Sequence, residues 1–241
     1  MKITLARLRQ IIKEETKLVL KESSISGKPA YLLFHFPSKK LHWVETDISS
    51  ASKTPEDNTL PKGKIVKSWT ATSGKPTIPA LDPKPENVDD YIPYGIAAAL
   101  KDMPYKGPLP PGLYYTRDPE DMPWYWKNKF GNMINRHIIT RAYKYVDAAK
   151  RFTNWRGGKA AWGQWRVWLE PNNADVGKRS GFTIHGGKIW GSSGCIDLTD
   201  QILDFKSDYM AYTKKYGSHM SLYSVYDPLP EDFGKAARIQ T

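Results

Sequence analysis

Residues 30–47, AYLLFHFPSKKLHWVETD, carry the clearest signal for the architecture of this chain. They contain an apolar and aromatic run, AYLLFHF, then a polar break, PSKK, and a second run, LHWVETD. Two short runs of this kind, separated by a turn that contains proline, are typical of strands joined in a hairpin. The folded part of the chain is therefore predicted to begin with a β-hairpin.

Short runs that resemble strands continue along the rest of the chain. They are KIVKSWTAT (64–72), LYYT (113–116) behind the proline-rich GPLPPG, WGQWRVWLEP (162–171), GFTIHGG (181–187) and SLYSVYDP (221–228). Within residues 162–171, Trp162 and Trp168 share one face while Trp165 and Val167 share the other. Many short strands with a few inserted helices predict a mainly β fold of the α+β class.

Three helices are predicted from the spacing of apolar residues. Two of them cover residues 133–152 and 198–217. The apolar side of the second is formed by Leu198, Ile202, Phe205 and Tyr209. The third, an amphipathic helix over 1–27, has its apolar side formed by Leu5, Leu8, Ile12 and Val19. This N-terminal helix either packs on the main domain or serves as a docking or delivery segment.

The chain of 241 residues is long enough for one large domain with a substantial core. We predict a main domain over 28–228, between the N-terminal helix and a tail over 229–241. Two segments within it, about 77–106 and 117–160, are interpreted as insertions. Long irregular insertions in a compact domain are often functional.

Net charge and apolar patterning restrict the partners. The formal net charge of +11 and a pI near 9.5 favour polyanionic surroundings, such as nucleic acid, an anionic membrane or a cell envelope. No dense Lys/Arg block or nucleic-acid-binding motif is present, so nucleic acid is not an expected partner. The sequence has no apolar stretch of about 18 residues, which predicts no transmembrane segment. Charges interrupt every apolar run near the N-terminus, so no Sec signal peptide is expected.

Residues 183–200, TIHGGKIWGSSGCIDLTD, contain the only cysteine of the chain, Cys195. His185 stands ten residues before it (195 − 185 = 10). A nucleophilic cysteine needs a base, a cation or a helix N-terminus nearby, and we expect His185 to act as the base and a helix beginning near Leu198 to favour the thiolate. Gly194 permits a sharp turn, and the N–H groups from Ser193 to Cys195 are placed to form an oxyanion hole.

Two other interpretations of Cys195 are a buried structural residue and a metal ligand, and the first stays open at this point. A free cysteine is commonly a small buried apolar residue. A metal site is not expected, because one cysteine and five scattered histidines do not have the spacing of zinc ligands.

The residues His185-Gly186, followed by Ser192-x-Gly194-Cys195-Ile196, resemble the motif of the L,D-transpeptidase (YkuD-type) catalytic domain. The resemblance extends upstream. KSWTATSGKPT and GPLPPGLYYT occupy the places of that family's strand with a Gly-Lys-Pro-like turn and its T-P-x-G-x-Y/F-like segment, and the opening hairpin resembles its first two strands. The resemblance spans roughly residues 30–228 and implies a YkuD-like β-sandwich or barrel with a catalytic cysteine and no cofactor.

The motif also departs from the common pattern of that family. Ser193 stands in the place of a second histidine, Asp197 in the place of an Arg or Asn, and the spacing is shorter. The short-spacing HG…SxGC form resembles a branch that includes type VI secretion effectors directed at the peptidoglycan of rival bacteria. Membership of that branch implies peptidoglycan peptide stems as substrate, with a secretion machine and an immunity protein as partners. It also implies synthesis in the cytoplasm, a non-Sec route of export or delivery, and action in the periplasm or cell envelope.

The resemblance implies a chemical mechanism as well. His185 takes the proton of Cys195, and the thiolate attacks the carbonyl that follows the L-centre of diaminopimelate in a tetrapeptide stem. The N–H groups of Ser193, Gly194 and Cys195 hold the oxyanion while D-Ala leaves. An amine of another stem, a free D-amino acid or water then resolves the thioacyl-enzyme. The departures at Ser193 and Asp197 leave open a module of the same fold that binds the wall without turnover.

Four further residues are candidates, each with a plainer alternative. Ser192 is interpreted as supporting the cysteine loop, or as an ordinary turn serine. Arg179 is placed to meet a stem carboxylate, or is an exposed surface arginine. Trp190 and Tyr114 are candidates for walls of a substrate cleft, or are packing residues of the core.

Overall fold

The computed structural model of the chain describes residues 28–47, 60–74, 107–122, 158–188, 190–217, 219–230 and 233. Within these residues, eight strands form one sheet with the order β3-β2-β1-β8-β4-β5-β6-β7. The predicted helices over 1–27 and 133–152, the insertion at about 77–106, and Lys75 and Pro76 of the Gly-Lys-Pro turn lie outside the described residues. Most of the predicted 229–241 tail lies outside them too.

In the part of the chain that the structure describes, the strands are short, as predicted, and the helices are few. The strands are β1 (Ala30–His35), β2 (Lys40–Glu45), β3 (Lys64–Thr70), β4 (Gly112–Asp121), β5 (Trp165–Pro171), β6 (Phe182–His185), β7 (Ile196–Asp197) and β8 (Ser221–Val225). The helices are α8 (Gly158–Trp162), the 3-10 helix η2 (Thr199–Gln201) and α9 (Ile202–Tyr216). The prediction of a mainly β, α+β fold is confirmed.

The opening hairpin forms as the sequence predicts. β1 and β2 pair antiparallel from Ala30↔Glu45 to His35↔Lys40. The turn between them places Lys39 at a φ of 52°, a left-handed conformation that closes the chain back on itself. On its other side, β1 pairs parallel with β8, which brings the two ends of the described chain into neighbouring strands.

Two predicted boundaries differ from the structure. The strand predicted over 162–171 begins at Trp165, because Trp162 closes α8 and Gly163 then turns the chain at a φ of 69°. Trp162 therefore lies outside β5. The segment predicted as an insertion over about 117–160 gives its first five residues to β4 and its last three to α8.

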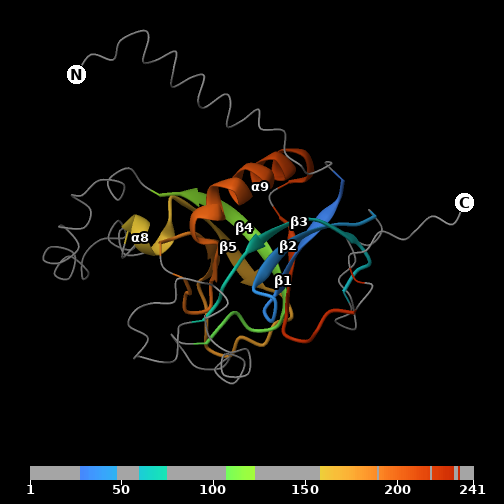
Figure 1. Cartoon of the computed structure of the whole chain (residues 1–241), viewed down its shortest axis with the longest axis horizontal. Helices are drawn as coiled ribbons and strands as arrows, with labels where there is room; N and C mark the ends of the chain where they lie inside the picture. Colours follow the sequence, from blue (N-terminus) through green and yellow to red (C-terminus); the bar gives the residue numbers. More distant parts are fainter. Residues whose placement is uncertain are drawn as a thin grey trace, which may run out of the picture.

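Helix α9 lies across the sheet and closes the larger of its two apolar cores (Figure 1). Phe205 packs edge-on against Trp69 of β3, with ring centroids 5.1 Å apart. Tyr209 lies 5.7 Å from Trp165 of β5, and Tyr212 lies 5.3 Å from Trp43 of β2. Full burial of a large apolar side chain contributes about 1.5–3 kcal/mol, so these contacts fix α9 on the sheet. The predicted apolar side of this helix, Leu198, Ile202, Phe205 and Tyr209, is buried.

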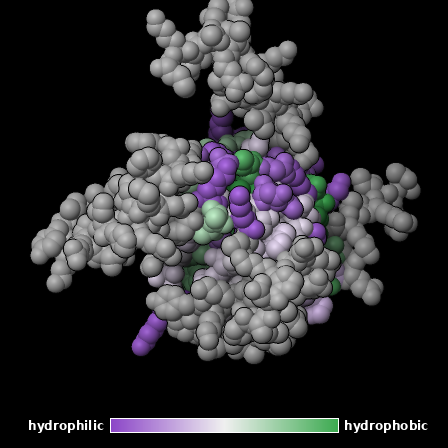
Figure 2. Space-filling view, turned by 60° about the vertical axis from the view of Figure 1, so that its left-hand side comes forward, coloured by the Kyte–Doolittle hydropathy of each residue, from purple (hydrophilic) through white to green (hydrophobic). Residues whose placement is uncertain are grey.

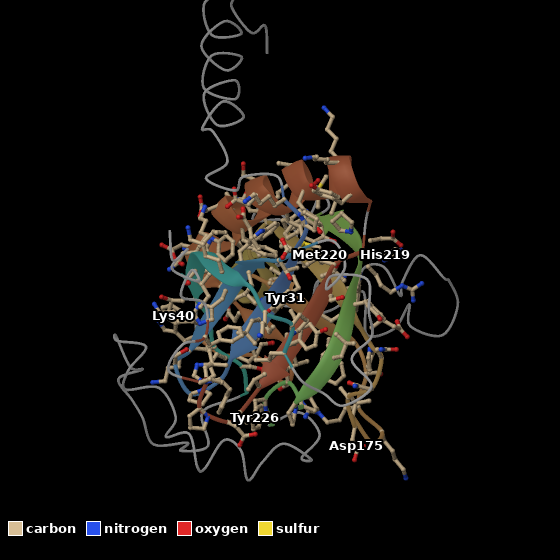
Figure 3. All side chains as sticks on the ribbon, turned by 90° about the vertical axis from the view of Figure 1, so that its right-hand side faces the viewer. Tyr31, Lys40, Asp175, His219, Met220 and Tyr226 are labelled. Carbon is tan, nitrogen blue, oxygen red and sulfur yellow. The ribbon has the colours of Figure 1, made fainter. Side chains whose placement is uncertain are left out.

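A second, smaller core lies on the opposite face of the sheet. It is formed by Tyr31, Leu33, Val44, Leu113 and Tyr223. The two faces of the central strands are therefore both covered. In Figure 3, His219 and Met220 lie at the end of the sheet where β8 begins, and Tyr226 lies at the other end; Met220 and Tyr226 belong to the larger core.

The surface of the described part is mixed in character. Its exposed large hydrophobic side chains are Leu203, Met210 and Tyr216, all on α9. Figure 2 shows hydrophilic residues beside hydrophobic ones on the face that it presents. None of the helices among the described residues has the length and apolarity needed to cross a membrane.

The two edges of the sheet meet, which gives it a curled form. β3 and β7 are at opposite ends of the strand order, yet Thr72, just after β3, forms an antiparallel bridge with Asp197 of β7. The Thr72 N–H donates to the Asp197 carbonyl at 3.0 Å, and the Asp197 N–H donates back at 2.8 Å. Gly74 N–H also donates to the Ser192 carbonyl, at 2.8 Å. The residues around Cys195 therefore lie at a seam between the first and last strands of the sheet order.

Candidate active site

A row of polar side chains runs across the sheet toward this seam. The strand registers place its members as neighbours in the order Glu120, Arg166, His185, Asp197 and Thr72. Because paired residues project from the same face, these five side chains share the face of β5–β7 that points away from α9. Arg166, His185, Asp197 and Thr72 are each at most 2% exposed. A row of buried polar groups is unusual in a sheet and indicates a functional region.

Cys195 lies beside this row and not in it. β6 and β7 are parallel, with Ile184 opposite Ile196 and His185 opposite Asp197. The same register places Cys195 level with Thr183, two residues from the level of His185. Cys195 is 4% exposed, and its Sγ–H donates to the carbonyl of Gly181 at 3.8 Å.

The tautomer of His185 follows from its hydrogen bond. Nδ1 lies 2.7 Å from the Gly186 carbonyl, which can only accept, so Nδ1 carries the proton in the neutral ring. Nε2 therefore presents a lone pair, and within the described part of the chain this buried atom has no hydrogen-bond partner. Burial, together with the charge of Arg166, lowers the pKa of His185 to about 4. The ring is thus a neutral base with an available nitrogen.

The structure does not join His185 to Cys195 by a hydrogen bond, which the sequence had led us to expect. Nδ1 is bonded to Gly186 and Nε2 is without a partner. The pairing of Asp197 with His185 explains this, because it holds Cys195 one step away along the sheet. A rearrangement of side chains must bring Sγ to Nε2 before a proton can pass.

The helical segment begins near Leu198, as predicted: Leu198 is the N-cap of η2, which starts at Thr199 and is followed by α9 at Ile202. The two-residue strand β7 separates Cys195 from this segment. The expected effect of the helix on the thiolate stays a prediction. Burial raises the pKa of the Cys195 thiol, while the neighbouring residues Thr183 and Ser192 and the charge of Arg166 act in the opposite direction. The resting thiol is therefore protonated.

Gly194 holds the sharp turn that was predicted before the cysteine. Its φ of 84° is left-handed, and a Cβ there would collide with the Arg179 guanidinium and the Phe182 ring. Arg179 is partly buried in this position: its Nη2 donates to the Gly107 carbonyl at 2.8 Å, and the guanidinium lies 5.4 Å from the centre of the Phe182 ring. The interpretation of Arg179 as an exposed surface residue is therefore wrong, and the structure brings it against the cysteine loop.

Gly186 is required by space on the other side of the site. A Cβ at this position would overlap the Ile202 side chain and the Thr199 carbonyl at the start of the α9 segment. Gly186 N–H also donates to the Trp162 carbonyl at 3.3 Å. The glycine after His185 therefore allows β6 to pass closely between α8 and α9.

The remaining predicted residues divide between the loop and the core. Ser192 supports the loop through its carbonyl, which accepts from Gly74, and Ser193 beside it is partly buried. Trp190 is partly buried against the larger core. Tyr114 is fully buried, and its hydroxyl donates to the Pro110 carbonyl at 2.9 Å, which are the contacts of a core residue.

Other residues of the site were not identified from the sequence as candidates. Arg166, Trp162, Thr72 and Thr183 lie in or beside the polar row, and Asp197 had been noted only as a departure from the family motif. The available signal was an arginine within the tryptophan-rich strand WRVW.

Burial raises the pKa of Asp197 to about 7, although hydrogen bonds from the N–H groups of Thr199 and Gly191 act to lower it.

Unpartnered polar atoms concentrate in this region. In the described residues, four of the five buried side-chain N or O atoms without a hydrogen-bond partner belong to it: Thr72 Oγ1, Thr183 Oγ1, His185 Nε2 and Asp197 Oδ2. Buried polar groups are normally satisfied, so a cluster of exceptions calls for a chemical explanation. Among the same residues, no group of three His, Cys, Asp or Glu side chains is arranged to hold a metal ion.

A scan against protein-family models found no match, and a search of curated proteins found none either. Among solved structures, a structure of Bd1075 from Bdellovibrio bacteriovorus is similar to this chain, with 12% sequence identity and a TM-score of 0.39. The similarity covers 81% of this chain and 47% of that one, so this chain spans about half the length of that structure. The function proposed below therefore rests on this chain's own residues.

Proposed function

We propose that this chain is a cysteine acyl-transferase of the L,D-transpeptidase (YkuD) type, acting on peptidoglycan tetrapeptide stems. One observation carries the proposal: the single cysteine immediately precedes β7, the strand that pairs with the strand of a neutral histidine, in a buried region where polar atoms lack partners. The motif residues His185, Gly186, Ser192, Gly194 and Cys195 all meet at this seam of the sheet. The resemblance of that motif supplies the substrate.

The chemistry begins with proton transfer from Cys195 to His185. Nε2 of His185 accepts the Sγ proton, and Nδ1 stays bonded to the Gly186 carbonyl, which stabilises the imidazolium. The thiolate attacks the carbonyl after the L-centre of diaminopimelate, and the oxyanion is held by N–H groups from Ser193 to Cys195. The C–N bond to D-Ala breaks as His185 returns the proton to the leaving amine.

The thioacyl-enzyme is resolved by a second nucleophile. An amine from another stem gives a crosslink, a free D-amino acid gives exchange, and water gives carboxypeptidase activity. His185 removes a proton from the incoming group, and Cys195 leaves as the thiol. Arg179, which lies against the turn at Gly194, is placed to attract a carboxylate of the stem. The setting for this reaction is the cell envelope, reached by export or by delivery into a target cell.

Incubation of the purified protein with tetrapeptide muropeptides tests the proposal. Mass spectrometry of the products should show loss or exchange of D-Ala with the wild type. It should show no turnover with Cys195→Ala, and His185→Gln should lose activity without changing the fold. Equal turnover by wild type and Cys195→Ala would contradict the proposal.

A second candidate is a module that binds peptidoglycan without turnover. It is favoured by the resting state of Cys195, a buried thiol whose proton is donated to Gly181 and not to His185. Binding to purified sacculi, with no alkylation of Cys195 by iodoacetamide at any pH at which the protein is folded, would establish this alternative.

A further inference from the structure

Arg166 is a buried charged residue beside the proposed catalytic pair. It lies on β5 opposite His185, and its side chain is 1% exposed. Its guanidinium stacks on two indole rings, 4.5 Å from the centre of Trp168 and 5.3 Å from that of Trp162. A guanidinium is more weakly hydrated than an ammonium and stacks on aromatic rings, so it keeps its charge when buried in this way.

Glu120 is the counter-ion of Arg166. Its Oε2 accepts from Nη2 at 2.7 Å and from Nε at 3.1 Å. Glu120 is 41% exposed, so part of its charge is solvated while that of Arg166 is not. Glu120 therefore shares its ion pair with a cation that is much less solvated than itself.

Trp162 connects this ion pair to the catalytic histidine. The centroid of the Trp162 ring lies 4.9 Å from that of the His185 ring, and the Arg166 guanidinium stacks on the same indole. Cys195 is one register step further along the same face. The charged and titratable groups facing this region are Glu120 from β4, Arg166 from β5, His185 from β6, Asp197 from β7 and Arg179 from the loop before β6.

We propose that the Glu120–Arg166 ion pair is the electrostatic control of this site: the guanidinium favours the Cys195 thiolate and the neutral form of His185, and Glu120 moderates both effects. Arg166 is thus a positioning residue that acts through the two reacting groups and does not contact the substrate. The inference rests on the proposed function only in taking Cys195 as the nucleophile.

The physical reason is the low polarity of the surroundings. Charge interactions weaken with the effective dielectric constant, which is far below that of water in a buried site. The charge of Arg166 lowers the pKa of both His185 and Cys195, although burial is the larger influence on each. For the thiol this opposes burial and favours the nucleophile; for the imidazole it adds to burial and keeps the base free of its proton.

Two substitutions separate an electrostatic role from a structural one. Arg166→Gln removes the cation, and Glu120→Gln removes the anion that compensates it. An electrostatic role shifts the pKa of the Cys195 thiol in opposite directions, upward in Arg166→Gln and downward in Glu120→Gln. A structural role disturbs the same ion pair in both variants and shifts the thiol in one direction or not at all. Arg166→Lys keeps the charge and restores part of the wild-type behaviour.

Arg117 and Glu170 supply the matched control on the same pair of strands. They form a 3.0 Å ion pair whose side chains are 55% and 57% exposed. Arg117→Gln and Glu170→Gln change the net charge of the protein by the same amounts as the two test variants. Because exposed charges are screened by solvent and salt, they leave the titration of Cys195 within error of the wild type.

The readout is the rate of iodoacetamide alkylation of Cys195 across a pH series, with the His185 ring signals followed by NMR in the same samples. At neutral pH we expect several-fold slower alkylation in Arg166→Gln and several-fold faster alkylation in Glu120→Gln, since one pKa unit changes the thiolate fraction about tenfold. Circular dichroism and thermal melting establish that each variant is folded. If Arg166→Gln does not fold, an upward shift or no shift of the thiol pKa in Glu120→Gln still overturns the inference.

Shifts of the same sign in both variants, or shifts as small as those of the Arg117 and Glu170 controls, would overturn the inference. The muropeptide assay is run on the same proteins. Opposite shifts without turnover of muropeptides support the ion pair's role while contradicting the proposed function, and turnover without opposite shifts does the reverse.

Discussion

The two faces of strands β5, β6 and β7 differ sharply in what they bury. On the face toward α9, Val167, Ile184 and Ile196 join the large aromatic core. On the other face, Arg166 and His185 occupy the alternate positions of the same strands. The alternation of a strand lets one short segment serve two purposes, since apolar burial on one face stabilises the fold that the polar face requires.

The largest predicted effect of a substitution on the polar face is at Cys195. Cys195→Ala should reduce D-Ala release from tetrapeptide stems by about 10³-fold or more, because the nucleophile is lost, and change the free energy of unfolding by less than about 1 kcal/mol. Muropeptide mass spectrometry and urea unfolding measure the two effects. A large loss of stability with activity retained would show that the polar face is a structural core.

A substitution on the apolar face should produce the reverse. Phe205 is fully buried against Trp69 and Trp165, so Phe205→Ala should lower the free energy of unfolding by about 3–5 kcal/mol through lost contacts and a cavity. In the fraction that stays folded, alkylation of Cys195 should keep its wild-type pH profile. An altered profile at unchanged stability would mean that the two faces are not separable.

The polar face should also reveal itself in the pH dependence of stability. The pKa of Asp197 is raised from 3.8 to about 7, so the folded protein binds a proton there that the unfolded chain has released. Asp197 therefore costs stability progressively as the pH rises from about 4 to about 7. Asp197→Asn removes this cost and should stabilise the protein above pH 7 by up to roughly 4 kcal/mol, at about 1.4 kcal/mol per pKa unit.

His185 has the opposite effect on the pH dependence of stability, because its pKa is lowered and not raised. Its pKa is lowered from 6.5 to about 4, so it reduces stability as the pH falls through that range. In urea unfolding at a series of pH values, Asp197→Asn should thus change the alkaline side of the profile and keep the acid side. A parallel shift at all pH values would contradict the assignment.

The smallest predicted effect concerns the cysteine loop. Gly194→Ala adds a collision with Arg179 and Phe182 to the cost of a left-handed φ, whereas Gly177→Ala, at a φ of 55°, meets no atom within 4 Å. We expect a loss of about 1 kcal/mol for Gly177→Ala and about 1 kcal/mol more for Gly194→Ala, measured by thermal melting. Equal losses would show that the loop yields without contacting Arg179.

The elements of the fold were predictable because their signals are local. The hairpin at residues 30–47 has apolar runs bounded by a turn, and α9 has a regular apolar side packed on the sheet. The start of β5 was less predictable, because Trp162 belongs to α8 and not to the strand. This boundary depends on the left-handed turn at Gly163 and on the packing of Trp162 against His185 of β6. Local pattern thus identified most elements while tertiary contacts set their ends.

The candidate site was predictable only in its motif. The sequence predicted the segment from His185 to Cys195 but not its register, which is the parallel pairing of β6 with β7, nor the bridge that joins Asp197 to Thr72 across 125 residues (197 − 72 = 125). The two-residue strand β7, which lies between the cysteine and the helical segment that starts after Leu198, was not predicted. The part of Arg166 in the site was not predicted either, because an arginine in a strand is ordinarily exposed. Its burial depends on contacts with Trp162, Trp168 and Glu120.

The central claim, that Cys195 is an acyl-accepting nucleophile supported by His185, is tested most directly by intact-protein and peptide mass spectrometry after rapid mixing with a tetrapeptide muropeptide. We predict an added mass equal to the muropeptide less D-Ala, mapped to the peptide that contains Cys195 and absent from Cys195→Ala and His185→Gln. Release of D-Ala that persists in Cys195→Ala, or an adduct mapped to another residue, would contradict the account.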